Sequence, residues 1–114
     1  MKEIWKDIEG YEGLYRISNL GCVYSVKRDI YMSQRTDRRG YMIVNLCKHN
    51  EKKTFRIHRL VANAFLLNTH NKPEINHIDG NKKNNCIDYL EWVTAKENTQ
   101  HAIKTGLISY SARR

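Results

Sequence analysis

The chain has 114 residues, and its 20 lysines and arginines against 12 aspartates and glutamates give a net charge of +8. This length suits one domain, or two small modules that share a core, and the three scattered cysteines favour neither a disulfide framework nor a zinc knuckle. No stretch approaches the roughly 18 apolar residues of a membrane span, and the N-terminus lacks a signal peptide's apolar run, so we expect a cytoplasmic protein without a membrane partner.

The first half of the chain predicts a small antiparallel sheet followed by a helix. Strand-like segments occur in pairs separated by polar or Asn/Gly turns, which indicates two hairpins: 14–18 with 22–26, and 41–47 with 53–58. In the following stretch "HRLVANAFL", apolar residues recur on one helical face: Leu60, Val61, Ala64 and Phe65. We expect this helix to pack on the sheet.

The second half predicts a short strand, a long polar loop and another strand. The strand "EIN" (74–76) follows a polar connection with the only proline, and "LEWVT" (90–94) is the second strand. The loop between them opens with the turn dipeptide Asp79-Gly80 and is rich in asparagine. His77 stands at the end of the first of these strands.

A helix is predicted directly after the second strand. Thr94 and Glu97 have the spacing of a capping box, and Gly106 is the expected end of the helix. Asn98 lies in the first turns and shares a helical face with His101. In so small a unit, Asn98 and the histidine that ends the first strand could meet at one ion.

Positive charge is concentrated in residues 27–59, which hold ten basic and three acidic side chains and so carry seven of the eight net charges. Such a surface suits a polyanion, with an affinity that falls as salt rises. We therefore predict nucleic-acid contacts from this window and from two lysines of the polar loop: Arg35, Arg38, Arg39, Lys52, Lys53, Arg56, Arg59, Lys82 and Lys83.

Residues 76–98, "NHIDGNKKNNCIDYLEWVTAKEN", preceded by "HRLVANAF", resemble the ββα-metal motif of HNH endonucleases. The N-terminal "EIWKDIEGYEGLYRISNLGCVYS" is similar to the nuclease-associated module ahead of that motif in phage and intron homing endonucleases. The resemblance implies an α+β fold, with a small N-terminal antiparallel sheet and a packed helix followed by the ββα-metal motif. It also implies three parts: a DNA-binding module at 1–45, a nuclease domain at 46–106 and a tail at 107–114.

The resemblance further implies the chemistry of the site. His77 is the expected general base, and Asn76 and Asn98 are the expected ligands of one divalent cation, Mg²⁺ or Mn²⁺, per active site. An imidazole with a pKa of about 6.5 suits the removal of a proton from water, and an oxygen-bound cation suits the charged phosphate. The expected reaction is cleavage of double-stranded DNA that leaves 5′-phosphate and 3′-hydroxyl ends. His58 and His101 are auxiliary candidates.

Two positions depart from the family pattern. Asn76 stands where many relatives carry aspartate, and a neutral ligand implies weak metal binding in the absence of the substrate's phosphate. Tyr89 stands where the pattern has an asparagine that braces the loop carrying the histidine. Asp88 and Asn85 are the two candidates to replace that bracing side chain.

The leading interpretation is a metal-dependent DNA endonuclease that nicks or cuts both strands. Low sequence specificity is expected, because the chain ends at "GLISYSARR" without the helix-turn-helix segment of longer relatives. The alternative, motivated by Asn76 and Tyr89, is a catalytically impaired double-stranded DNA-binding module; a structural or interaction domain would leave the clustered charge unexplained. A monomer and a homodimer are both compatible with the sequence, and a bacterial or phage-infected cell is the expected setting.

Overall fold

The computed structural model describes residues 2–104, so the predicted helix end at Gly106 and the predicted tail at 107–114 lie outside the described residues. The chain begins with an antiparallel four-stranded sheet: β1 (Trp5–Asp7), β2 (Tyr15–Ser18), β3 (Val23–Ser25) and β4 (Ile30–Tyr31). An antiparallel three-stranded sheet follows: β5 (Arg35–Thr36), β6 (Met42–Lys48) and β7 (Glu51–Arg56). In the described part of the chain, no helix has the length and apolar character to cross a membrane.

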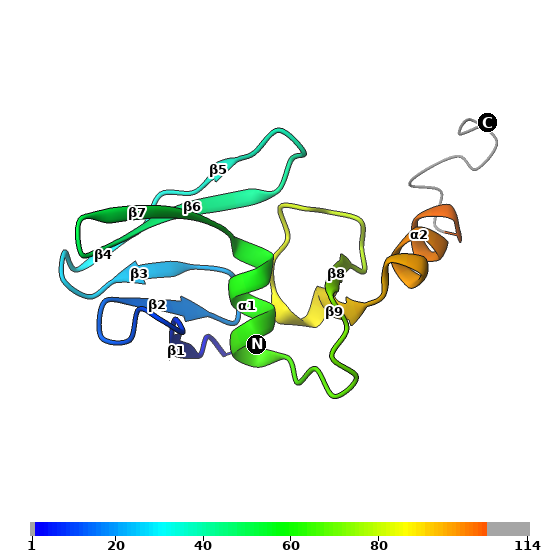
Figure 1. The fold of residues 1–114 in the computed structure, drawn as a ribbon, viewed down its shortest axis with the longest axis horizontal. Coiled ribbons are helices and arrows are strands. Elements are labelled where there is room, and N and C mark those ends of the chain that lie inside the picture. The colour runs from blue at the N-terminus through cyan, green and yellow to red at the C-terminus, as the bar shows by residue number, and fades with distance from the viewer. Residues whose placement is uncertain (1, 105–114) are drawn as a thin grey trace.

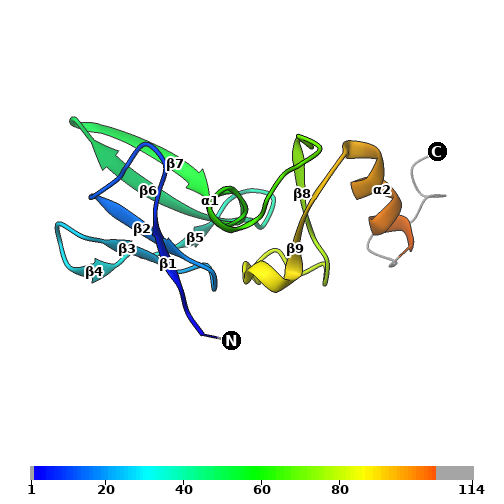
Figure 2. The same cartoon turned by 90° about the horizontal axis from the view of Figure 1, so that it is seen from below.

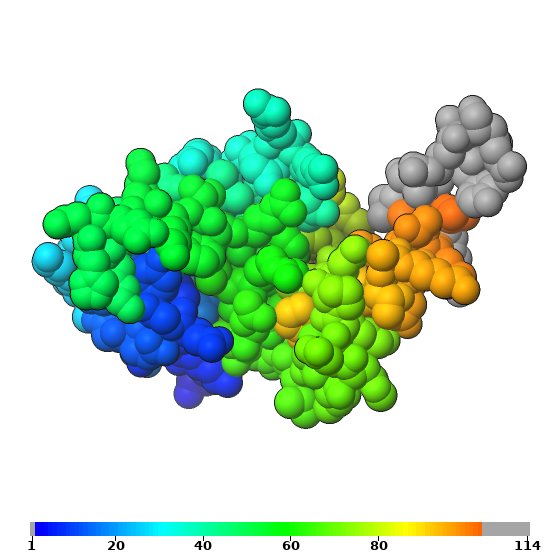
Figure 3. Space-filling view, in the orientation of Figure 1, coloured from blue at the N-terminus to red at the C-terminus, as the bar shows by residue number. Residues whose placement is uncertain are grey.

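Helix α1 (Ile57–Phe65) separates these sheets from a strand, strand, helix unit. That unit consists of β8 (Glu74–His77), the 3₁₀ turn η1 (Ile87–Tyr89), β9 (Leu90–Val93) and α2 (Ala95–Lys104). Figures 1 and 2 show the two larger sheets on one side of α1, with β8, β9 and α2 on the other. The space-filling view in Figure 3 shows the resulting elongated outline, which measures 50 × 28 × 25 Å. The predicted α+β architecture is confirmed.

Both predicted hairpins are present, but the second one has different limits. β7 begins at Glu51, because the turn consists of only two residues, His49 and Asn50, with φ of 53° and 62°. Two consecutive positive φ values are those of a type I′ turn. The predicted end of the second strand, Ile57 and His58, instead starts α1. The side chains of both residues are buried. In a strand with one exposed face, two consecutive side chains would point to opposite faces, and one of them would be exposed.

Helix α1 lies at the centre of one core that both halves of the chain share. It contacts the first two sheets and also β8, β9 and η1. Of the predicted inward face, Leu60 and Val61 are buried and Ala64 and Phe65 are partly buried. Around α1, core residues come from both ends of the described chain, from Ile8 to Leu90. The relative positions of the two larger sheets and the β8–β9 unit are therefore set by packing on α1.

The core also buries one imidazole of α1. His58 is only 5% exposed, and its ring stacks on Tyr41 with the ring centroids 4.9 Å apart. The ring of His77 lies on another side, with a centroid distance of 5.0 Å. Burial, together with repulsion from the neighbouring His77, lowers the pKa of His58 from 6.5 to about 3. His58 is therefore a neutral side chain at physiological pH.

The turn between β2 and β3 meets the loop that precedes β9. Gly21 in this turn has a φ of 91°, and a Cβ atom there would lie 3.1 Å from the Cβ of Asn85. Two residues earlier, the carbonyl oxygen of Asn19 accepts a hydrogen bond from the backbone N–H of Ile87 at 2.9 Å. The first sheet therefore supports residues 85–87 through both a close contact and a backbone hydrogen bond.

We expect Gly21→Ala to lower the free energy of unfolding by more than Gly10→Ala does. Both glycines have a positive φ, so both variants carry a left-handed strain of about 1 to 2 kcal/mol. Nothing lies within 4 Å of a Cβ atom at Gly10, so only Gly21→Ala adds a close contact with Asn85. Urea unfolding of both variants and the wild type measures the difference. Equal losses would contradict a tight contact between Gly21 and Asn85.

We expect the burial of His58 to make stability fall as the pH is lowered from 6.5 towards 3. In this range the unfolded chain binds a proton at His58 that the folded chain does not. Above pH 6.5 neither state binds it, so the stability is fully present there. His58→Gln should show a shallower loss of stability than the wild type in urea unfolding at a series of pH values. His70→Gln, at an exposed position, is the control and should retain the wild-type slope of stability against pH. The same slope in His58→Gln would contradict the expectation.

Candidate active site

The strand, strand, helix unit brings three of the predicted site residues together. Asn76 and His77 come from the end of β8, where each is about 95% buried, and Asn98 comes from α2. All three line one cleft of about 380 Å³, which Tyr41 and Lys82 also line. Residues separated by more than fifty positions in the sequence thus contribute to one small cleft.

The imidazole of His77 is held by Asn85. Nε2 of His77 lies 2.8 Å from Oδ1 of Asn85, and since an amide oxygen only accepts hydrogen bonds, Nε2 carries the proton and Nδ1 is left as the proton acceptor. Burial lowers the pKa of His77 below 6.5, although the bond to Asn85 and the charge of Asp79 oppose this in part. The ring is therefore neutral near pH 7. Of the two proposed substitutes for the missing asparagine, Asn85 makes the contact, whereas Asp88 is exposed.

The other polar residues of the loop hold its backbone. Asp79 accepts a hydrogen bond from the N–H of Asn81 at 3.0 Å through one carboxylate oxygen and from the side chain of Asn84 at 2.8 Å through the other. The side chain of Asn81 accepts a hydrogen bond from the N–H of Lys83 at 3.0 Å. Such Asx contacts stabilise turns without regular secondary structure. They explain why the loop is rich in asparagine, and they leave Asn85 to contact the imidazole.

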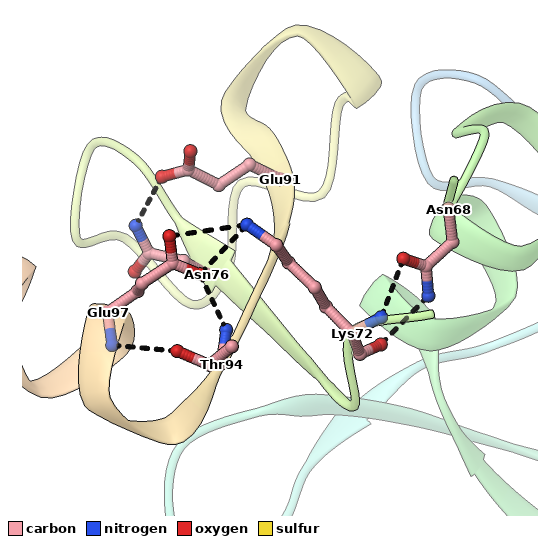
Figure 4. A network of polar contacts seen from close by, with 6 residues as sticks. All are labelled: Asn68, Lys72, Asn76, Glu91, Thr94 and Glu97. Carbon is pink, nitrogen blue, oxygen red and sulfur yellow. Dashed lines mark hydrogen bonds and ion pairs between the residues drawn. The ribbon is translucent and has the colours of Figure 1, made fainter. Parts of the chain in front are cut away.

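The predicted capping box fixes the start of α2. Thr94 N–H donates to Oε1 of Glu97 at 2.9 Å, and Glu97 N–H donates to Oγ1 of Thr94 at 3.1 Å. Lys72 adds an ion pair of 2.9 Å to the same glutamate, as Figure 4 shows. The backbone N–H of Asn98 bonds to the carbonyl oxygen of Thr94 at 3.0 Å. The cap thus places Asn98 at a defined position in the first turns, facing the end of β8.

The amides of Asn76 and Asn98 are each paired with a glutamate. Nδ2 of Asn76 donates to Oε2 of Glu91 at 2.8 Å, and Nδ2 of Asn98 donates to Oε1 of Glu74 at 3.1 Å. Because both amide nitrogens bond to carboxylates, the carbonyl oxygens of the two amides remain as the acceptor atoms. The sequence reasoning missed both glutamates. Glu91 stands directly opposite Asn76 in the β8–β9 register, so a strand alignment would have found it.

Three of the predicted basic residues share one face of the β5–β6–β7 sheet. Arg35 and Arg56 both pair with Ile43 of the central strand, and directly opposed residues of antiparallel strands lie on the same face. Lys52, four residues before Arg56 in the same strand, alternates onto this face as well. Lys53 lies on the other face. We refer to Arg35, Lys52 and Arg56 as the basic sheet face.

The turn after β5 connects the basic sheet face to the cleft. Nζ of Lys82 donates to the carbonyl oxygen of Arg39 at 2.7 Å and lies 4.6 Å from the ring centroid of Tyr41. The guanidinium of Arg56 lies 4.4 Å from that centroid and forms a 3.0 Å ion pair with Asp37. Both cations thus contact the ring that lines the cleft. Through Tyr41, Arg56 of the basic sheet face and Lys82 of the cleft therefore lie close together.

The remaining predicted residues are not among those that line the cleft. Arg38 and Lys83 are exposed. The guanidinium of Arg59 donates twice to the carbonyl oxygen of residue 73 at 3.3 Å, so it ties α1 to the chain before β8. Nε2 of His101 donates to the carbonyl oxygen of residue 78 at 3.0 Å. His58 contacts the ring of His77 from the core, as described above.

Two family patterns match the chain. The pattern of the NUMOD4 motif covers residues 3–47, and that of an HNH endonuclease covers residues 55–100. Among similar proteins, DNA endonuclease I-HmuI of Bacillus phage SP01 is 41% identical over 94% of this chain and 62% of its own length. The SPbeta prophage-derived putative HNH homing endonuclease YosQ of Bacillus subtilis is 39% identical over 93% of this chain and 61% of its own.

A solved structure supports the same relationship. It concerns DNA binding and cleavage by the HNH homing endonuclease I-HmuI, and it superimposes with a TM-score of 0.88 at 40% identity over 96% of this chain. The match covers 63% of the solved chain, so the present chain spans about three fifths of these two relatives. The chain is homologous to I-HmuI: its residues 55–100 match the HNH endonuclease family, and its residues 3–47 match the NUMOD4 motif.

Proposed function

We propose that the chain is a metal-dependent endonuclease that hydrolyses phosphodiester bonds of double-stranded DNA. The observation that carries this proposal is the cleft in which Asn76, His77 and Asn98 meet, with the imidazole of His77 held by Asn85. The names of the relatives agree, since I-HmuI is named a DNA endonuclease and its solved structure concerns DNA binding and cleavage. Relatives from a phage and a prophage suggest DNA in a bacterial or phage-infected cell as the substrate.

The donor set of the cleft fits a divalent cation, which HNH nucleases generally use. Asn76 and Asn98 line the cleft with their amide nitrogens bound to glutamates, so their carbonyl oxygens are the atoms left for a ligand. Mg²⁺ and Mn²⁺ prefer oxygen ligands, and Mg²⁺ commonly takes few from the protein and the rest from water and phosphate. A cation held by these two side chains would stabilise the negative charge that develops on the scissile phosphate and the leaving oxygen.

In this proposal, His77 removes the proton from the attacking water. Its Nδ1 is the free acceptor, because Nε2 donates to Asn85, and the lowered pKa keeps the ring neutral near pH 7. Asn85 holds the ring and does not itself react. Lys82 lines the same cleft and would contact a phosphate next to the one that is cut. The products are a 5′-phosphate and a 3′-hydroxyl.

The basic sheet face would hold the DNA by its phosphates. Arg35, Lys52 and Arg56 lie on one face, and Arg56 and Lys82 meet at Tyr41 beside the cleft. Contacts to phosphates position a protein on DNA without reading its sequence. The backbone of a duplex lying along this face would pass the cleft that contains His77.

We expect His77→Ala to lower the rate of plasmid nicking with Mg²⁺ or Mn²⁺ by about 10²- to 10⁴-fold, because a general base contributes that much. The measurement follows the conversion of supercoiled plasmid to relaxed and linear forms. His70→Ala, at an exposed position, and an EDTA sample serve as controls. Binding of the plasmid should persist in His77→Ala. If the wild type binds DNA but makes no metal-dependent breaks, the chain is a DNA-binding module and the proposal is wrong.

We expect Lys52→Ala to weaken binding to duplexes of any sequence and to reduce the slope of log affinity against log salt by about 1. The reason is the loss of one phosphate contact from the basic sheet face. Fluorescence anisotropy with two unrelated duplexes over a salt series measures both effects. Lys2→Ala, which removes an exposed lysine of the N-terminal segment, is the matched control for net charge. An equal change in both variants would contradict a DNA contact of Lys52 on the basic sheet face.

A further inference from the structure

The two amides that line the cleft share one feature. Each donates its NH₂ group to a partly buried glutamate, Asn76 to Glu91 and Asn98 to Glu74. Figure 4 shows the amide nitrogen of Asn76 directed at the Glu91 carboxylate. Among the side chains that the structure describes, no lysine or arginine forms an ion pair with either glutamate. Each of the two carboxylates thus faces an amide and no described lysine or arginine.

A carboxylate behind an amide has two physical effects. A carboxylate only accepts hydrogen bonds, so it fixes which end of the amide faces it and leaves the carbonyl oxygen on the other side. A charge-assisted hydrogen bond also polarises its donor, and the amide oxygen becomes a stronger electron donor. Carboxylates that hydrogen bond to metal ligands orient and strengthen them in the same way in other proteins. Neutral asparagine ligands benefit most, since they bring no charge of their own.

We propose that Glu91 and Glu74 are positioning residues that orient Asn76 and Asn98 and supply the negative charge for a divalent cation at the two amide oxygens. This inference rests on the proposed function, which places the cation there. In this arrangement the negative charge that balances the cation comes from two glutamates. They contact the two asparagines and not the cation itself.

The same geometry gives a reason for asparagine at position 76. An aspartate there would place its carboxylate where an amide nitrogen now lies 2.8 Å from Oε2 of Glu91. Two carboxylates at that separation repel each other, and the hydrogen bond between residues 76 and 91 would be lost. We therefore expect Asn76 and Glu91 to act as a pair. Asn76→Asp alone should not increase the affinity for a cation. Asn76→Asp combined with Glu91→Gln should restore the hydrogen bond between residues 76 and 91, and the negative charge would then lie on residue 76.

The test measures Mn²⁺ binding to the full chain by electron paramagnetic resonance. It uses the His77→Ala background with a DNA duplex, so that cleavage is slow during the measurement. Asn76→Ala and Asn98→Ala report on the proposed cation site. Glu91→Ala should weaken Mn²⁺ binding by about 10- to 100-fold. Glu91→Gln keeps an acceptor for the amide and should lose less. Glu9→Gln removes the same charge at an exposed position of the first module and should leave Mn²⁺ binding unchanged.

Each outcome separates the two proposals. If Asn76→Ala and Asn98→Ala leave Mn²⁺ binding unchanged, the cation site itself is wrong. If these variants weaken binding but Glu91→Ala and Glu74→Ala do not, the cation site stands and the inference about the glutamates is overturned. A double variant, Asn76→Asp with Glu91→Gln, that binds no better than Asn76→Asp would also overturn it. Thermal unfolding of every variant checks the fold, and Glu91→Gln, which preserves the shape of the side chain, keeps the test valid if Glu91→Ala is unstable.

Discussion

The hydrogen bond between His77 and Asn85 is the interaction on which the rest of the site depends. It holds a buried imidazole in one tautomer, and it is itself held from the other half of the molecule. Gly21 lies against Asn85, and the carbonyl oxygen of Asn19 accepts a hydrogen bond from the backbone N–H of Ile87. The N-terminal sheet therefore acts on the candidate catalytic histidine through a chain of contacts. A glycine is favoured at position 21 because its φ of 91° is strained for other residues and because a Cβ atom there would lie 3.1 Å from the Cβ of Asn85.

The second constraint is the packing around α1 and Tyr41. α1 contacts all three sheets, so the basic sheet face and the cleft keep a fixed relation. Tyr41 has His58 stacked on its ring at 4.9 Å, while Arg56 and Lys82 each lie within 5 Å of the ring centroid. A neutral His58 matters in this cluster, since a third positive charge beside two cations and His77 would be costly. Burial of His58 in the core thus permits two cations to stand next to the cleft.

Sequence reasoning was correct where a local rule decides the structure. The capping box of Thr94 and Glu97 and the buried face of α1 follow from spacings within a few residues. It missed β1, β4 and β5, because strands of two or three residues are too short to show a period. The equally short β3 was predicted from the Asn/Gly turn before it. It also left the partner of His77 open between Asn85 and Asp88. That choice depends on which of the two side chains is buried. Contacts between the loop and the first sheet decide this, and they are not visible in the sequence.

The placement of charge around the cleft follows one physical requirement. A protein that approaches a polyanion gains from a positive surface, yet a divalent cation needs negative charge close to its ligands. A carboxylate exposed in the cleft would meet the second need and repel the approaching phosphate. In the proposed site, an amide in the cleft with a glutamate at its nitrogen would separate the two demands. The phosphate would meet a neutral carbonyl oxygen, while the negative charge lies across the hydrogen bond on the other end of the amide. If the proposed function holds, the basic sheet face and the paired amides are two parts of one electrostatic arrangement. It would combine a positive surface for the DNA with negative charge that is hydrogen bonded to neutral ligands.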